Sequence, residues 1–188
     1  MSAFEVSATP LAGLTLVTRR RREDPRGYFG RFFCADAMRE LGWTLPVAQV
    51  NHSLTRKRGA VRGLHFQHPP HAEDKYVSCL RGAVYDVAVD LRRGSPTFLR
   101  WHAQTLSAEN GCSLLIPQGF AHGFQALKPE SELIYLHSRA YAPEAEGGLH
   151  AADPRLAVEW PLPVGDLSAR DAHHPLLDAG FSGLNVTP

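Results

Sequence analysis

The chain has 188 residues, of which 44% are hydrophobic and 21% charged, and its formal net charge is +1. Such a chain fits a single domain over residues 1–188, and its near-neutral charge excludes the electrostatic field that nucleic acids and anionic membranes require of a partner. An odd number of cysteines without metal-type spacing predicts reduced thiols in the cytoplasm, and the lack of a leader or an apolar run of membrane length predicts a soluble protein.

From the N-terminus onward, short segments alternate apolar and polar residues between Gly, Pro and Asn, which is the signal of β-strands. The basic run at 19–22 is followed at once by Glu23 and Asp24, which indicates a solvated loop. Asp36 is the expected N-cap of a helix over 36–41, with Gly42 just past its end. The predicted strands are 14–18, 27–33, 47–55, 61–67, 75–81, 83–92, 100–106, 111–116, 123–126 and 132–141.

After Trp160 the pattern breaks into a tail rich in Pro and Gly, which Leu176 and Leu177 are expected to tie to the domain. Upstream of it, turn residues recur at close spacing between the strands, as at 92–96 and 107–111. Many short strands with close turns predict an antiparallel sandwich or a double-sheet barrel.

Two spacings narrow the choice of barrel. The segment 111–122 reads G-x5-P-x-G-x2-H and resembles the second signature of cupin barrels. The segment 63–82 keeps the spacing of the first signature, G-x5-H-x-H-x3-E-x6-G, but its ligand positions hold Pro69, His71 and Lys75. A metal cupin needs three or four N or O ligands. The resemblance therefore implies an all-β, cupin-type double-sheet jelly-roll barrel with short flanking helices, no metal site and no other cofactor.

His65 is the first candidate for chemistry. If its strand alternates, it shares a face with Gly63 and Gln67, and on a barrel strand that face can be the interior. A structural role for a lone histidine stays open at this point.

Cationic side chains gather in neighbouring segments, namely Arg62, Lys75 and His122. Buried charge without a partner is costly, so several cations converging on one interior demand an anion. A phosphorylated or nucleotide-linked ligand answers that demand.

Tyr135 and Tyr141 are six positions apart, so an unbroken strand would put both on one face. They are open to two interpretations, as packed aromatics or as a proton donor and a stacking platform. Asp171 in the tail would cap a turn, or return to the barrel and hold a histidine in its basic tautomer.

Eight short motifs occur in order along the chain: R-G-x-F at 26–29, Q-x-N at 49–51, R-G-L-H-F-Q at 62–67, K-Y-V at 75–77, D-x-x-V-D-L-R-x-G-S-P-T-F at 86–98, P-x-G-x-A-H-G-F at 117–124, Y-x5-Y-x-P at 135–143 and L-S-x-[KR]-D at 167–171. Together, over about residues 14–175, they resemble the dTDP-4-dehydrorhamnose 3,5-epimerase family of cupin-fold nucleotide-sugar epimerases.

The resemblance implies proton abstraction and return at C3, C5 or both of a nucleotide-diphospho-4-keto-6-deoxyhexose. It makes His65 the general base, oriented by Asp171, and Tyr135 the acid on the opposite ring face. Lys75 would stabilise the enolate oxygen. Substrate would be held by Arg26, Phe29, Arg31, Gln49, Asn51, Arg62, His122, Tyr141 and Arg170.

Arg31 stands where family members that use a thymidine nucleotide usually carry a glutamate, so a CDP- or GDP-linked sugar is an alternative substrate. A metal-dependent cupin enzyme, with a site built from His65, His68, His71 and His122, is an alternative enzyme class. A non-catalytic sugar-binding cupin is a third. Otherwise solvent or loop positions are expected for His68, His71, His173 and His174.

Edge strands of an open barrel attract other strands unless they are covered. The resemblance implies that they are covered by pairing or exchange between two copies, so we expect a homodimer.

Overall fold

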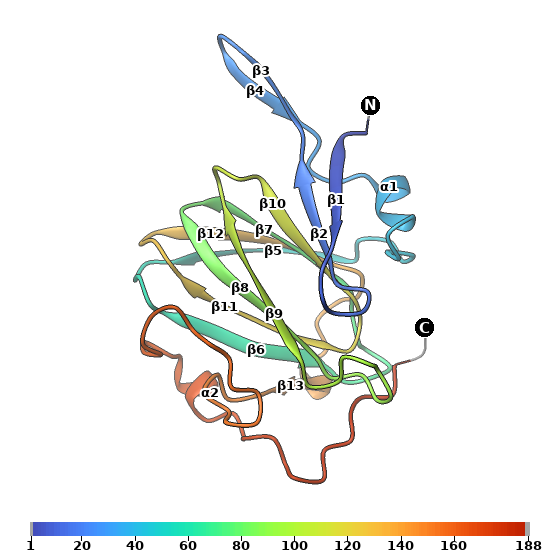
Figure 1. The fold of residues 1–188 in the computed structure, drawn as a ribbon, viewed down its shortest axis with the longest axis vertical. Helices are drawn as coiled ribbons and strands as arrows, with labels where there is room; N and C mark the ends of the chain where they lie inside the picture. The colour runs from blue at the N-terminus through green and yellow to red at the C-terminus, as the bar shows by residue number, and fades with distance from the viewer. Residues whose placement is uncertain (1, 187–188) are drawn as a thin grey trace.

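The computed structural model describes residues 2–186 and consists mainly of two antiparallel β-sheets packed face to face (Figure 1). The first sheet has the order β1-β2-β10-β7-β12-β5, with β1 (Phe4–Ala8), β2 (Thr15–Arg19), β10 (Cys112–Ile116), β7 (Lys75–Arg81), β12 (Ser131–His137) and β5 (Gln49–Thr55). The second has the order β13-β6-β11-β8-β9, with β13 (Glu146–Gly148), β6 (Val61–Gln67), β11 (Phe120–Ala126), β8 (Ala83–Asp90) and β9 (Trp101–Ser107). The predicted all-β double-sheet architecture is confirmed.

The main core lies between the sheets, where alternation turns one row of each strand inward. Its buried side chains include Val77, Leu114 and Leu133 from the six-stranded sheet, with Val84 and Phe124 from the five-stranded sheet. Apolar packing fills one end of this interior. At the other end the inward rows carry polar side chains, and there the functional site forms.

Both outer faces are also covered. Helix α1 (Ala35–Arg39) buries Met38 over the six-stranded sheet together with Trp43 and Tyr76. The C-terminal segment, orange to red in Figure 1, runs beneath the five-stranded sheet and includes the short helix α2 (Ala169–Ala172). Leu177 ties this segment down as expected, whereas Leu176 is 55% exposed and does not.

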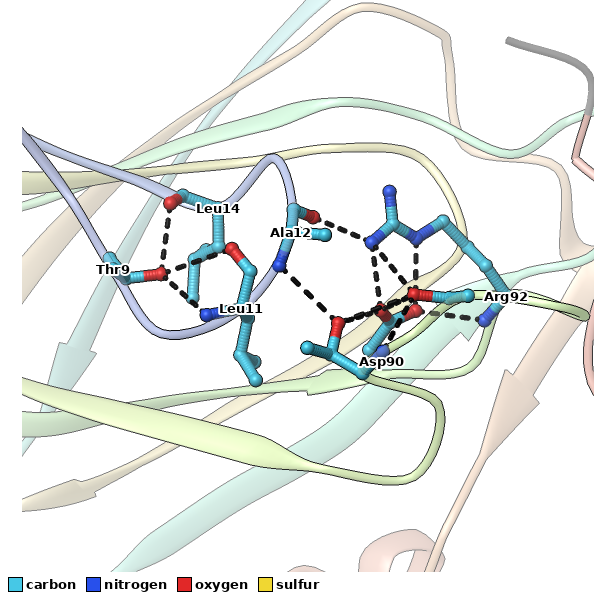
Figure 2. A network of polar contacts seen from close by, with 8 residues as sticks. Thr9, Leu11, Ala12, Leu14, Asp90 and Arg92 are labelled. Carbon is cyan, nitrogen blue, oxygen red and sulfur yellow. Dashed lines mark hydrogen bonds and ion pairs between the residues drawn. The ribbon is translucent and has the colours of Figure 1, made fainter.

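A polar network holds the N-terminal loop to the turn after β8 (Figure 2). The Asp90 carboxylate is fully buried and accepts hydrogen bonds from the Arg92 guanidinium and from the hydroxyls of Ser95 and Thr97. Arg92 also donates to the Ala12 carbonyl. Burial opposes ionisation of Asp90, but these hydrogen bonds outweigh it and hold its pKa below the ordinary 3.8.

Several elements differ from the sequence prediction. The basic run is not a loop, because 21–24 form strand β3 (Arg21–Asp24), paired with β4 (Gly27–Gly30) in an exposed hairpin. Strands β1 and β13, the single turn of 3-10 helix η1 (Pro143–Ala145) and helix α2 were not predicted. The N-cap of α1 is Cys34 rather than Asp36. Within residues 2–186, no helix is both long and apolar enough to cross a membrane.

Candidate active site

A cavity of about 750 Å³ opens between the two sheets. Its walls come from β5, β7 and β12 on one side and β6 and β11 on the other, with the α2 segment at the rim. Ten of the thirteen predicted site residues line it: Gln49, Asn51, Arg62, His65, Lys75, His122, Tyr135, Tyr141, Arg170 and Asp171.

The best-defined pair in the cavity joins β6 to the tail. His65 Nε2 lies 2.8 Å from Asp171 Oδ1, and the backbone N–H of Gly63 donates to Asp171 Oδ2 at 3.3 Å. Burial opposes ionisation of Asp171, but the hydrogen bonds from His65 and Gly63 hold its pKa below the ordinary 3.8. An ionised carboxylate only accepts, so the His65 proton sits on Nε2 and the lone pair on Nδ1.

A local break in alternation puts two functional side chains on one wall. In the register of β6 with β11, His65 faces His122 and Arg62 faces Phe124, so three steps on one strand match two on the other. Such a bulge turns both Arg62 and His65 inward. The expectation that Gly63 shares the face of His65 is therefore wrong. A Cβ on Gly63 would lie 2.5 Å from the Gly123 Cα, so only glycine fits there.

Tyr135 stands on the opposite wall, on β12 of the six-stranded sheet. Its hydroxyl shares a hydrogen bond with Ser53 Oγ at 3.0 Å, and its ring stacks on His137 with centroids 6.2 Å apart. Burial raises the pKa of Tyr135 well above 10, so the phenol keeps its proton at neutral pH. That protonated form is the one a proton donor needs.

The expectation that the cavity's cations lack partners holds only in part. Three predicted cations each face a carboxylate that the sequence prediction missed: Lys75 with Glu73 at 3.1 Å, His122 with Asp86 at 2.8 Å and Arg170 with Glu146 at 2.9 Å. Within residues 2–186, the cavity-lining Arg62 and Arg139 form no ion pair. Both residues are exposed, so neither is a buried charge in need of a partner, but both are available to bind an anionic ligand.

The pair of His122 and Asp86 is more deeply buried than the pair of His65 and Asp171. Asp86 is fully buried, burial raises its pKa, and its second oxygen has no hydrogen-bond partner among the described residues. The His122 ring meets Tyr135 edge-on, with centroids 6.1 Å apart. Asp86 therefore holds His122 against the tyrosine.

Three predicted substrate-binding residues do not reach this cavity. Arg26, Phe29 and Arg31 lie on or just after the β3–β4 hairpin, which projects away from the sheets (Figure 1). Arg26 pairs with Asp24 at 2.7 Å, and Phe29 is 77% exposed. Tyr141 does reach the cavity, but not on an unbroken strand, because β12 ends at His137.

Comparison with known proteins identifies the family to which the chain belongs. The family model described as dTDP-4-dehydrorhamnose 3,5-epimerase matches residues 8–179. The chain belongs to this family. It is therefore a member of an epimerase family, which is an isomerase by reaction class, and the cupin-type barrel is confirmed.

Relatives of the chain include both double and single epimerases. It is 42% identical over 168 residues to a dTDP-4-dehydrorhamnose 3,5-epimerase of Sinorhizobium fredii, covering 89% of this chain and 86% of that protein. It is also 42% identical over 176 residues to a dTDP-4-dehydrorhamnose 3-epimerase of Streptomyces niveus, covering 91% and 84%. A structure from Legionella pneumophila in complex with dTDP-4-keto-L-rhamnose superimposes with a TM-score of 0.89 at 38% identity, covering 98% of this chain and all of that one.

In this chain, the side chains at the metal-ligand positions of the cupin fold cannot bind a metal ion. The carboxylate position holds Lys75, whose ammonium is paired with Glu73 and cannot ligate. His71 is 42% exposed and lies 3.8 Å from Glu144, and neither it nor His68 lines the cavity. The alternative metal site built from His65, His68, His71 and His122 is therefore not assembled.

His137 lines the cavity, although no role was predicted for it. The Tyr141 N–H donates to Gln49 Oε1, Gln49 Nε2 donates to Asn51 Oδ1, and Asn51 Nδ2 faces His137 Nε2 at 3.3 Å. This relay makes Nε2 an acceptor, so Nδ1 carries the proton. Burial and the nearby Lys75 lower the pKa of His137 to about 4, which keeps the ring neutral. The sequence alone gives no sign that His137 lines the cavity, because its place there depends on how β12 lies beside its neighbouring strands.

His174 was expected in solvent or a loop, and it does lie in the loop after α2. Its side chain is nevertheless only 12% exposed, because the ring packs against His65 with centroids 5.4 Å apart. Burial, followed by the nearby His65, lowers the pKa of His174. Its neighbour His173 is exposed, as expected.

Proposed function

We propose that this protein inverts C3, C5 or both of a dTDP-linked 4-keto-6-deoxyhexose by moving protons, without a metal or redox cofactor. The observation that carries the proposal is the placement of a histidine–aspartate pair and a tyrosine on opposing sheets across one cavity. The bound sugar nucleotide in the Legionella relative supports the substrate class.

The first step is removal of a proton from the carbon beside the C4 ketone. The lone pair on His65 Nδ1 takes the proton, the C–H electrons form an enolate, and Asp171 stabilises the imidazolium that results. The Lys75 ammonium supports the charge that develops on the enolate oxygen, a contribution of about 3 kcal/mol per donor in comparable sites.

The second step returns a proton from the other face of the sugar ring. Tyr135 occupies the opposing wall with its phenol protonated, so it donates to the carbon and inverts the centre. The imidazolium of His65 then releases its proton to solvent and the phenolate regains one, which restores both groups. Loss from one face and gain on the other is what separates epimerisation from simple hydrogen exchange.

The nucleotide diphosphate is assigned to the cavity cations without ion pairs. Arg62 supplies a guanidinium whose planar fork suits phosphate oxygens. Gln49 and Asn51, together with His122, Tyr141 and Arg170, would hold the sugar and base. A CDP- or GDP-linked sugar is the alternative substrate, because Arg31 stands where family members that use a thymidine nucleotide usually carry a glutamate.

Two copies would complete this site. Arg26, Phe29 and Arg31 are assigned to substrate by the family resemblance, yet their hairpin projects away from the cavity of its own chain (Figure 1). In a homodimer the hairpin would reach the partner's cavity, which reconciles the two. Light scattering should give about twice the 20.7 kDa chain mass. A stable monomer would contradict this.

Mixing two inactive variants tests the shared site directly. A variant with Arg26→Ala and Phe29→Ala loses the hairpin side chains but keeps His65 as the general base. A His65→Ala variant loses the general base but keeps the hairpin side chains. Half of randomly re-formed dimers are mixed and each restores one site of two, so about one quarter of wild-type activity should return. No recovery in verified mixed dimers would mean that the hairpin does not act in trans.

The reaction is tested by NMR in deuterated water with dTDP-, CDP- and GDP-linked 4-keto-6-deoxy sugars. Deuterium entry with inversion at C3, C5 or both identifies the reactive centres, and the preferred nucleotide is read in the same experiment. Exchange with none of the three substrates would overturn the proposed function and favour a non-catalytic sugar-binding protein. The three cysteines are free thiols, which supports a cytoplasmic location.

A further inference from the structure

A third potential ligand stands beside the catalytic pair. His174 Nε2 lies 3.6 Å from Asp171 Oδ1, the oxygen that also faces His65 Nε2 at 2.8 Å. The three ligand atoms all lie within 4.8 Å of one another. Among the described residues, no other cluster of three or more His, Cys, Asp or Glu side chains comes this close.

The position of His174 is set by packing. A Cβ on Gly148 would overlap the imidazole, so the ring lies directly against the backbone of β13. Its Nε2 is buried and has no hydrogen-bond partner among residues 2–186. A buried nitrogen without a hydrogen-bond partner is costly in free energy. The nearest carboxylate, that of Asp171, is already hydrogen-bonded to His65.

We propose that His65 Nε2, Asp171 Oδ1 and His174 Nε2 form a site for a divalent transition metal such as Zn²⁺, and that the ion inhibits the enzyme rather than serving it. Two imidazoles and a carboxylate are ligands that Zn²⁺ accepts, at about 2.0–2.2 Å in tetrahedral geometry. Such ligands lie about 3.3 Å from one another. Two of the three ligand pairs, at 2.8 and 3.6 Å, fall on either side of that spacing, and the two imidazole nitrogens lie within 4.8 Å of each other, so side-chain movements would bring the three onto one ion. The fourth position would be left to water.

One neighbouring charge opposes the ion. Arg170 Nη2 lies 3.4 Å from His65 Nε2, and its Nε lies 3.8 Å from Asp171 Oδ1. Its side chain is 55% exposed, so an outward swing would break the ion pair with Glu146, which at such an exposed position contributes little stability. We therefore expect binding in the micromolar range rather than the tight binding of a structural zinc site.

Inhibition follows from the tautomer of His65 and rests on the proposed function. The ion takes the Nε2 lone pair, and the ring proton passes through solvent to Nδ1. The nitrogen that would abstract the substrate proton is then protonated, and the base is lost. This site uses none of the positions that bind metal in other cupins.

Binding is tested on the full-length protein freed of metal with a chelator. Co²⁺ is titrated while its visible absorption is recorded, and Zn²⁺ is titrated by calorimetry. His174→Phe retains an aromatic ring but removes the metal-binding nitrogen. His173→Ala is the matched control, because it removes a neighbouring histidine that is not part of the site. We expect one ion per chain in the wild type and the control, with affinity at least about tenfold lower in His174→Phe. If that variant does not fold, His174→Gln replaces it.

The outcomes separate the site from the reaction. Absence of binding in the wild type, or equal affinity in His174→Phe and wild type, overturns the metal site. Where a 4-keto sugar is turned over, Zn²⁺ should inhibit wild type reversibly and His174→Phe at least about tenfold less, each measured against its own metal-free rate. Metal binding that depends on His174 in a protein with no epimerase activity would leave the site standing and refute the proposed function.

Discussion

Replacing Tyr135 with Phe separates proton return from proton removal. Among residues 2–186 the hydroxyl has one hydrogen-bond partner, Ser53 at 3.0 Å, and the Ser53 hydroxyl is free to turn to cavity water once the phenol is gone. The loss of stability should therefore be about 0.5–1.5 kcal/mol. Loss of a general acid costs about 10²–10⁴ in rate, equivalent to about 3–5 kcal/mol. The rate effect should exceed the stability effect several-fold.

The assay for Tyr135→Phe follows deuterium entry and stereochemistry together by NMR. Inversion should fall by the factor given above, while hydrogen exchange persists at one carbon, because abstraction needs only His65. Ser53→Ala is the control, since it removes the same hydrogen bond and leaves the phenol in place. Inversion at the wild-type rate by a folded Tyr135→Phe protein would refute the assignment of the acid.

Three further variants test other parts of the structure. Asp171→Asn should lower kcat by about 10²–10⁴ with the fold intact, since an amide can donate to His65 and reverse its tautomer; unchanged turnover would contradict the dyad. Asp90→Asn should cost about 3 kcal/mol in urea unfolding, because a buried amide replaces the acceptor of Arg92. Folding lowers the pKa of Asp90, so the contribution of this carboxylate to wild-type stability is present above pH 3.8 and is lost as pH falls through the lower folded value. An Asp90→Asn protein as stable as the wild type would show that the network is dispensable. Gly123→Ala should cost about 1–3 kcal/mol and reduce activity, because its Cβ would lie 2.7 Å from the Arg62 carbonyl oxygen in β6; a fully active, stable variant would show that the bulge tolerates change.

Regular strands could be predicted from the sequence. The bounds of β6 and β7 agree with the predicted 61–67 and 75–81, because their patterns and flanking turns are clear. Strand β1 was missed because four of its five residues are exposed and its pattern carries no buried face. The end of β12 was placed too late, because apolar residues continue beyond His137 although the ladder stops there.

The site could be predicted only as far as its residue types. Family motifs selected ten residues that do line one cavity. The carboxylate partners Glu73, Asp86 and Glu146 were missed because each pairing depends on how strands and segments meet in space. The bulge in β6 was missed for a related reason, since strict alternation gives no sign that Arg62 and His65 turn the same way.

The carboxylate of Asp171 belongs to the short helix α2 in a C-terminal segment that otherwise consists of loops and turns, rather than to either sheet. Besides side-chain packing, isolated bridges from Ala60 to Gly165 and from Arg92 to Leu184 attach this segment to the barrel. Segments with few ladder hydrogen bonds open at lower free energy than the sheets that they cover. On warming, activity should therefore be lost before the far-ultraviolet circular dichroism of the strands changes. Heat inactivation would then result from detachment of the C-terminal segment rather than from unfolding of the barrel.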